Sequence, residues 1–169
     1  MEAYEAILTR RSVRAYTKQA VPDTLIRDLL VAGVSAPSAG NQQPWHFVVV
    51  TDRERLDALA EVLPYGKMLH DAPLGIVVCA DPDLQKYEGY WVQDCCNATE
   101  NILLAAHAKG LGGVWIGVHP QPAREAEVRR VLGMPERVFP LCVLSVGYPA
   151  ESTGPVDRYQ ESRVHRNRW

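Results

Sequence analysis

The sequence contains no apolar run of the roughly 18 residues from which a membrane-spanning helix is built. Its longest apolar stretches, Pro73–Ala80 and Val138–Tyr148, have the length and composition of buried strands. The first ten residues include two acidic residues and no long apolar core, unlike a secretory signal. We therefore expect a cytoplasmic protein that does not enter a membrane.

Patterns typical of metal sites and disulfide frameworks are also missing. The four cysteines have no C-x-x-C spacing, and the five histidines form neither an H-x-x-x-H pair nor a cluster with cysteine. Because the cysteines lie in apolar segments, we interpret them as reduced thiols of the core; they are Cys79, Cys95, Cys96 and Cys142. We expect no metal site.

Signatures of hydrolytic and nucleotide-cleaving enzymes are absent as well, namely the G-x-S-x-G elbow, the Walker loop and H-E-x-x-H. The adjacent Cys95 and Cys96 resemble a catalytic thiol pair, but they lie on the apolar stripe of a predicted helix and are interpreted as core residues. His119, which precedes Pro120, is interpreted as a surface-turn histidine. No side chain is therefore predicted to act as a catalytic nucleophile or base.

The composition is that of a folded protein. The 169 residues are 47% hydrophobic and 22% charged, close to the average of globular domains. A chain of this length buries roughly 70% of its unfolded surface. No repeat, linker or low-complexity segment interrupts it, so we predict a single domain over residues 1–169.

Arginine is concentrated at the two ends of the chain. Seven of the fourteen arginines lie in the first fourteen and last twelve residues, whereas residues 15–157 hold eleven Lys or Arg against seventeen Asp or Glu, a net charge of −6. A nucleic-acid-binding protein is usually basic over a whole face, so that class is excluded. Basic ends on an acidic body favour a small, strongly anionic ligand.

Hydrophobic periodicity predicts helices alternating with strands. Expected helices cover residues 2–9, 22–34, 52–63, 89–108 and 122–132, and expected strands cover residues 46–51, 74–80, 114–118 and 141–147. An irregular tail follows to Trp169. Glycines at 110, 112 and 113 are expected to stop the fourth helix. This order predicts an α/β (α+β) fold with a mixed central sheet flanked by helices.

Three segments contain residues suited to ligand binding. Arg10-Arg11-Ser12-Val13-Arg14 offers guanidiniums and a hydroxyl to a phosphate, or is a solvated charge run at a helix end. Residues 36–45, with Ser38, Asn41 and Gln43, offer hydrogen-bonding groups to a heteroaromatic ring, or form an ordinary loop. Residues 110–117 lack the third glycine of a dinucleotide fingerprint, and read either as backbone donors for a flat ligand or as a core strand.

Together these segments resemble the FMN-dependent nitroreductase family. The matching motifs occur in the order of the family and span nearly the whole chain: Arg-Arg-Ser-x-Arg at 10–14, Pro-Ser-x-x-Asn-x-Gln-Pro-Trp at 37–45, the Lys67-Met-Leu segment leading into the strand at 74–80, Gly-Leu-Gly-Gly-x-Trp-Ile-Gly at 110–117, and the arginine-rich end from Arg158 to Trp169.

The resemblance implies an intertwined homodimer with FMN at the subunit interface. Arg10, Arg11 and Ser12 would bind the phosphate and ribityl chain, joined by Arg158 or alternatively Arg163. Arg14 would lie near N1 and the C2 carbonyl of the flavin, and Ile116 and Gly117 would offer backbone N–H groups to N5 and the C4 carbonyl. Pro37, Ser38 and Asn41 would approach the same flavin from the partner subunit.

The activity implied is ping-pong transfer of a hydride from NADH or NADPH through flavin N5 to a small-molecule electron acceptor, such as a nitroaromatic compound or a quinone. Alternatives are another flavin reaction on the same scaffold, or a non-catalytic FMN-binding protein. Residues 81–90 lack the helical lid of longer relatives. Tyr87, Tyr90 and Trp91 either flank the flavin and stack an acceptor, or pack at the start of the helix.

Overall fold

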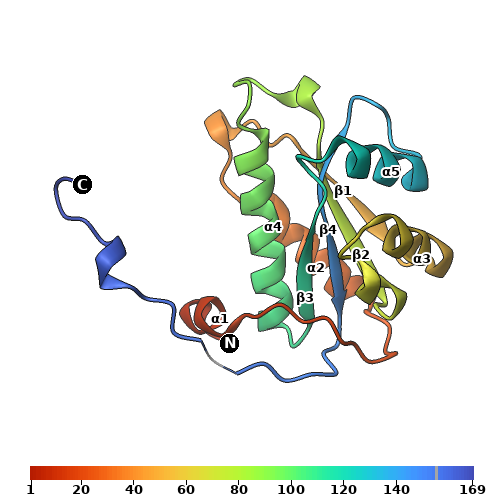
Figure 1. Cartoon of the computed structure of the whole chain (residues 1–169), viewed down its shortest axis with the longest axis horizontal. Helices are drawn as coiled ribbons and strands as arrows, with labels where there is room; N and C mark the ends of the chain where they lie inside the picture. Colours follow the sequence, from red (N-terminus) through yellow and green to blue (C-terminus); the bar gives the residue numbers. More distant parts are fainter. Residues whose placement is uncertain (155) are drawn as a thin grey trace.

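A computed structural model describes residues 1–154 and 156–169. Its centre is a four-stranded sheet in the order β1-β2-β4-β3, and every pair of neighbouring strands is antiparallel. The strands are β1 (Trp45–Val50), β2 (Leu74–Ala80), β3 (Gly112–Gly117) and β4 (Phe139–Gly147). Because β1 and β3 lie at the edges, each has one side that is not paired with another strand of the sheet (Figure 1).

Helices cover both faces of the sheet. α2 (Asp23–Val34) and α4 (Trp91–Ala108) pack on one face, and α3 (Arg53–Val62) and α5 (Pro122–Leu132) pack on the other (Figure 1). The core is divided accordingly: Ile76 and Val78 of β2 point to the α2–α4 side, and Val77 between them points to the α3–α5 side. Every residue of β2 is buried, which explains its continuous apolar sequence.

Local signals explain where the helices start and stop. The Asp52 carboxylate accepts the backbone N–H of Arg55 and caps α3. α5 begins at Pro122 and ends before Gly133, which has a left-handed conformation with φ of 63°. These boundaries confirm the corresponding predictions to within one residue.

One prediction about β3 is wrong. Gly110, with φ of 78°, ends α4 as expected, but Gly112 and Gly113 are the first two residues of β3 and do not stop the helix. The strand therefore begins two residues earlier than predicted. Its glycines serve a different purpose, which is the close approach of another segment.

The N-terminal segment runs along the free side of β3. After α1 (Ala3–Thr9), Ser12 forms a parallel bridge with Gly113, and Tyr16 forms an antiparallel bridge with Pro149. Among the described residues, the bridge between Ser12 and Gly113 is the parallel pairing that makes the sheet mixed. The C-terminal segment passes α1 and projects away from the body of the fold (Figure 1).

Within the described residues, none of the helices combines the length and the apolar character that a membrane crossing requires. The same residues contain no group of three or more His, Cys, Asp or Glu side chains arranged to hold a metal ion.

Candidate functional site

Two of the three predicted segments meet at the free side of β3. The backbone N–H of Val13 donates to the carbonyl of Gly113 at 3.1 Å. The approach is close enough that a Cβ atom on Gly112 would lie 2.7 Å from the Cβ of Val13. Glycine at position 112 therefore allows the segment Arg10–Arg14 to lie directly on the strand. We call this pairing the β3-edge site.

The first two arginines of this segment are held by protein groups. Arg10 forms an ion pair with Glu100 of α4 at 3.2 Å. The Arg11 guanidinium turns back on its own helix and donates to the carbonyls of Leu8 at 2.9 Å and Arg10 at 2.6 Å. Its Nε is buried and has no hydrogen-bond partner among the described residues. The site therefore retains an unused guanidinium donor beside Ser12.

Arg14 presents its side chain to solvent. Its backbone N–H donates to the carboxylate of Glu151 at 2.5 Å, whereas its guanidinium forms no hydrogen bond or ion pair with another described residue. Arg14 lines a hollow of about 290 Å³ together with Pro64, Tyr65, Lys67 and Met68. Arg14 and Lys67, whose charged groups have no hydrogen-bond or ion-pair partner in the described part of the chain, thus line the same hollow.

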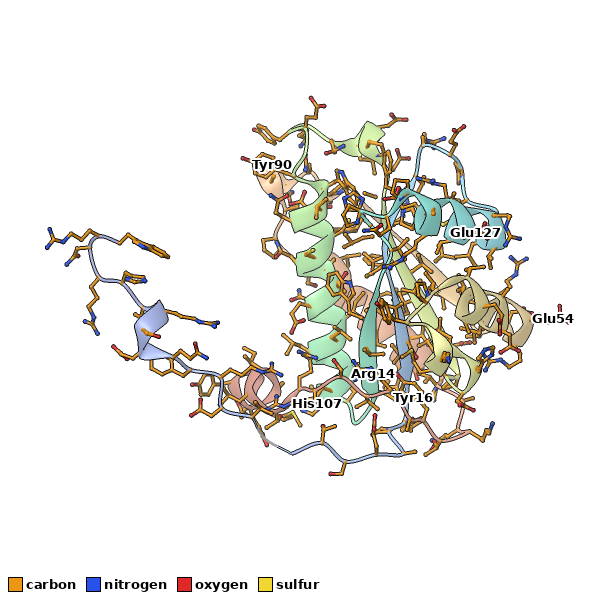
Figure 2. The ribbon with its side chains drawn as sticks, in the orientation of Figure 1. Arg14, Tyr16, Glu54, Tyr90, His107 and Glu127 are labelled. Carbon is orange, nitrogen blue, oxygen red and sulfur yellow. The ribbon has the colours of Figure 1, made fainter. Side chains whose placement is uncertain are left out.

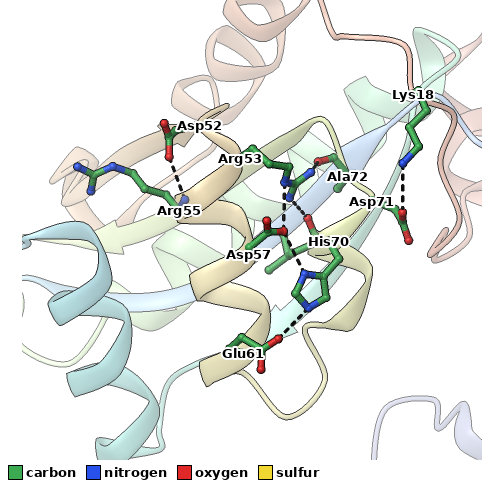
Figure 3. Close-up of polar contacts among 10 residues, drawn as sticks. Lys18, Asp52, Arg53, Arg55, Asp57, Glu61, His70, Asp71 and Ala72 are labelled. Carbon is green, nitrogen blue, oxygen red and sulfur yellow. Dashed lines mark hydrogen bonds and ion pairs between the residues drawn. The ribbon is translucent and has the colours of Figure 1, made fainter.

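Lys67 begins one of the motifs that resemble the family, but the sequence predicts no function for its side chain. Lys67 belongs to the 3₁₀ turn η2 (Lys67–His70), which is fastened to α3 (Figure 3). His70 of this turn lies 3.0 Å from the Asp57 carboxylate and 3.1 Å from that of Glu61, and Arg53 donates to the carbonyls of Leu69 and Ala72. These contacts determine where Lys67 stands relative to Arg14.

The register of β3 decides which backbone donors are available at the β3-edge site. Val118 donates its N–H to Leu141 of β4, and alternate residues of an antiparallel strand direct their backbone groups to the same side. Ile116 therefore directs its N–H toward β4, whereas Gly117 directs its N–H toward the free side, as Trp115 does. The prediction that Ile116 offers its N–H to a ligand at this edge does not fit the register, but that for Gly117 does.

The second predicted segment, residues 36–45, contains a compact loop that is stabilised by hydrogen bonds among its own residues. Gly40, Asn41 and Gln43 all have positive φ, between 48° and 54°, a conformation that costs energy for residues other than glycine. The loop is stabilised by its own side chains: Ser38 Oγ accepts the backbone N–H of Gln43 at 3.0 Å, and the Asn41 side chain accepts from that of Gln43 at 2.8 Å.

A buried carboxylate anchors this loop to α4. Asp94, which is only 2% exposed, accepts the backbone N–H of Ala39 at 2.9 Å and the side-chain amide of Gln42 at 2.6 Å. The carbonyl oxygen of the same Gln42 amide accepts the backbone N–H groups of Lys86 and Tyr87. Neither Asp94 nor Gln42 was singled out from the sequence, although a charged residue on the apolar stripe of a helix was a visible signal.

The loop and the N-terminal arginines flank one face of α4. Asn97 donates to the carbonyl of Pro37 at 3.3 Å, and Glu100, one turn further along the helix, pairs with Arg10. The side chains of Ser38 and Asn41 both bond to Gln43 of the same loop, and no hydrogen bond between described residues joins them to the segment 10–14. The predicted approach of this loop to a ligand from a partner subunit stays a prediction.

The C-terminal arginines belong to the end of the chain, which projects away from the body of the fold (Figure 2). Arg158 and Arg163 are exposed, and their guanidiniums have no partner among the described residues. The tail touches the β3-edge site through the carbonyl of Val156, which lies 3.5 Å from Nη2 of Arg11. Arg158 follows two residues later, within about 7 Å of chain, whereas the last residue, Trp169, is 99% exposed.

The aromatic residues before α4 have two different environments. Tyr87 and Tyr90 are exposed, and the Tyr87 ring covers Gly40, where a Cβ atom would meet it at 2.2 Å. Trp91 packs in the structure with its ring 4.7 Å from that of His119 and 5.7 Å from that of Phe139. The interpretation of His119 as a surface-turn residue is therefore only partly right, because its ring is packed and bonded to Glu125 at 2.9 Å.

The thiols have the properties expected of core residues. All four cysteines are free, and three are fully buried. Burial raises the pKa of Cys79 and of Cys142 to about 12 and also raises that of Cys95. Cys96 is half-buried, and its pKa is raised for the same reason. Thiolates are the reactive form, so these positions do not supply a nucleophile at neutral pH.

Comparison with protein families identifies the family to which this chain belongs. The model described as "Nitroreductase family" matches residues 7–63 and 56–148. A protein of Methanothermobacter thermautotrophicus, named "Putative NADH dehydrogenase/NAD(P)H nitroreductase", is 49% identical over the whole of this chain and 88% of its own length. This chain therefore belongs to the nitroreductase family.

Solved structures agree with this assignment. An FMN-dependent nitroreductase from Clostridium difficile superimposes with a TM-score of 0.91 at 30% identity, covering 98% of this chain and 99% of the other. A protein from Desulfovibrio desulfuricans, solved in complex with FMN, superimposes with a TM-score of 0.86 at 32% identity over 100% of this chain and 98% of the other. The fold is the nitroreductase fold, as the resemblance implied.

Proposed function

We propose that this chain is an FMN-dependent NAD(P)H oxidoreductase that passes a hydride to electrophilic acceptors of the nitroaromatic or quinone class. The observation that carries the proposal is the β3-edge site, where an arginine-rich segment lies on a strand with a free side in a member of the nitroreductase family. Bound FMN supplies the redox chemistry, because its N5 accepts and releases a hydride.

The donors of the β3-edge site suit the two ends of FMN. A phosphate monoester carries about two negative charges and several acceptor oxygens, which match Arg10, the buried Nε of Arg11 and Ser12. The ring requires hydrogen-bond donors at its carbonyls and nitrogens, which Arg14, Lys67 and the N–H of Gly117 offer. A cation near N1 stabilises the anionic reduced ring and favours its reduction.

The position of Arg158 supports a part in phosphate binding. The tail reaches Arg11 at Val156, and Arg158, two residues further along, is close enough in the chain to join the same end of the site. Arg163 lies five residues further along the projecting tail and is the alternative. We assign the phosphate to Arg158.

We further propose a homodimer in the cytoplasm, formed by the single domain of residues 1–169. The support is the apolar surface on the two terminal segments, where Tyr4 and Ile7 of α1 and Tyr159 and Trp169 of the tail are all more than half exposed. A partner subunit that covered these groups would bury them, and would also bring its Ser38 and Asn41 to the site. Sedimentation of the purified protein measures this, and a monomer at micromolar concentration would contradict it.

An absorption spectrum followed by anaerobic titration tests the enzymatic proposal. We expect a yellow protein whose flavin is bleached by NADH or NADPH and regains its colour on addition of a quinone. A colourless protein that does not take up added FMN would overturn the proposal. Bound flavin that no pyridine nucleotide reduces would favour the alternatives, another flavin reaction or a storage protein.

A further inference from the structure

His119 follows β3 and occupies the same end of the strand as Gly117. One residue, Val118, separates them, so the two backbones lie within about 7 Å of each other. The side chain of His119 is 28% exposed, which leaves one part of the ring accessible to solvent or substrate.

The Nδ1 atom of His119 is engaged by a buried carboxylate. The side chain of Glu125 in α5 is 10% exposed, and its Oε1 lies 2.9 Å from Nδ1 of His119. Its Oε2 accepts a hydrogen bond from Nη2 of Arg129 at 3.2 Å. A carboxylate only accepts hydrogen bonds, so Nδ1 must carry the hydrogen. Arg129 is itself held by the carbonyl of Val138 at 2.9 Å. This arrangement leaves Nε2 as the nitrogen that gains and loses a proton.

An aromatic side chain also packs against the ring. Trp91 of α4 makes an edge-on contact at 69° to the imidazole, and Phe139 of β4 stacks on Trp91. Among the described residues, the charged groups bonded to the imidazole are Glu125 and, through it, Arg129, both from α5. Nε2 has no hydrogen-bond partner within residues 1–154 and 156–169. The structure thus holds an oriented histidine whose free nitrogen is not used by the fold.

We propose that His119 is a catalytic residue that donates the proton needed when a quinone acceptor is reduced, an inference that rests on the proposed function. The quinone receives a hydride from N5 of the reduced cofactor, where an N–H bond breaks, and forms one O–H bond. It receives a proton from Nε2 of the His119 imidazolium and forms the second O–H bond. The products are a hydroquinone, the oxidised cofactor and a neutral imidazole, which regains its proton from water.

Glu125 acts as a positioning residue in this step. Its hydrogen bond keeps the proton of the neutral ring on Nδ1, as a carboxylate does for the histidine of a serine-protease triad. The competing explanation is that the pair only fastens α5 to the end of β3. The two explanations differ in whether Nε2 itself matters.

His119→Asn separates them, because its side-chain amide nitrogen takes the place of Nδ1 and keeps a donor toward Glu125 while Nε2 is lost. In stopped-flow experiments on the photoreduced holoenzyme, we expect oxidation by menadione to slow by about 10²-fold or more. Oxidation by ferricyanide, an electron acceptor that takes up no proton, should be unchanged.

A matched control is His46→Asn, which removes an exposed histidine from β1; we expect it to leave both oxidation rates unchanged. Nitrogen-detected NMR of the original protein gives a readout that does not depend on turnover. The neutral His119 ring should carry its hydrogen on Nδ1, and a ring protonated on Nε2 would overturn the proposal. An unchanged menadione rate in His119→Asn would overturn it as well.

Failure of this inference is distinguishable from failure of the proposed function. If the bound flavin is bleached by a pyridine nucleotide but His119→Asn behaves as the original protein, only the assignment of His119 is lost. If no pyridine nucleotide bleaches the flavin, the oxidoreductase proposal is lost, whereas the photoreduced protein still tests His119.

Discussion

A side chain at position 112 and the side chain of Val13 exclude each other: a Cβ atom on Gly112 would lie 2.7 Å from the Cβ and 2.8 Å from both γ-carbons of Val13. Atoms of the two residues therefore touch along the line where the arginine segment meets β3. The placement of Ser12, between Arg11 and Val13, depends on this contact.

We expect Gly112→Ala to displace the segment 11–14 from β3. Overpacking of this kind costs about 1–3 kcal/mol of the free energy of unfolding, and the displacement should weaken FMN binding because Ser12 and Arg11 move with the segment. Urea unfolding and the fluorescence of released flavin measure the two effects. Gly154→Ala is the control, since its Cβ would meet nothing within 4 Å; equal behaviour of the two variants would contradict the expectation.

Arg14→Ala should weaken the retention of FMN or slow its reduction by the nucleotide. The reason is that the guanidinium of Arg14 is not used by the fold and faces the hollow shared with Lys67, so its removal deletes a positive charge near the proposed ring position. Equilibrium dialysis of FMN and the rate of anaerobic bleaching test this. Arg27→Ala, which removes an exposed arginine from α2, should change neither, and unaltered binding and bleaching in Arg14→Ala would remove its assigned function.

Asp94→Asn should loosen the loop of residues 37–43. The Ala39 N–H and the Gln42 amide bond to different oxygens of the carboxylate. Because asparagine replaces one of these oxygens with an NH2 donor, one buried donor loses its partner at a cost of about 1–3 kcal/mol in the free energy of unfolding. Hydrogen exchange should become faster at Ala39 and at Tyr87, whose N–H depends on Gln42. Glu88→Gln neutralises an exposed acid nearby and serves as control. Exchange rates unaffected by Asp94→Asn would show that the carboxylate does not anchor the loop.

Tyr16 should make the fold sensitive to strong alkali. Burial raises the pKa of Tyr16 to about 12 from its ordinary value of 10.0. The single hydrogen of its hydroxyl lies within hydrogen-bond distance of two carbonyl oxygens, that of Val13 at 2.6 Å and that of Ser145 at 3.0 Å. Between these two values the unfolded chain releases the phenolic proton and the folded chain retains it. The contribution is therefore fully present below pH 10 and falls by about 2–3 kcal/mol as the pH rises to 12.

The measurement compares urea unfolding of the original protein and Tyr16→Phe at pH 8, 10 and 12. The contribution of the buried thiols to the free energy of unfolding falls over the same pH range in both proteins. The difference between the two free energies of unfolding therefore isolates the effect of Tyr16. We expect Tyr16→Phe to be less stable at pH 8 and the gap to narrow toward pH 12. A gap that does not change with pH would contradict the raised pKa.

Much of the secondary structure could be predicted because its signals are local. The Asp52 cap, Pro122 at the start of α5 and Gly133 after its end each act within one turn of chain, and the buried strand Leu74–Ala80 was predicted with its observed limits. The start of β3 was not, because Gly112 and Gly113 look like helix terminators until Val13 is seen beside them. That contact joins residues about a hundred positions apart.

The candidate site was likewise predictable where its signals are local and not predictable where they depend on contacts between distant segments. Arg10, Arg11, Ser12 and Arg14 were singled out because guanidiniums and hydroxyls in one short segment indicate anion binding, and the structure brings them to β3. The unsuitable direction of the Ile116 N–H depends on strand register, and the place of Lys67 depends on contacts between η2 and α3. Pairing of His119 with Glu125 requires the packing of α5 against the end of β3.

The order of residues alone determined which segments are helical or extended and which segments are rich in phosphate-binding side chains. Both properties arise from neighbours a few positions apart in the chain. Only the folded arrangement decided that the N-terminal arginines lie on the free side of an edge strand, that Asp94 holds a strained loop, and that one nitrogen of His119 is left unused. Such facts depend on distances between groups far apart in the chain, which are set when both faces of the sheet are buried together.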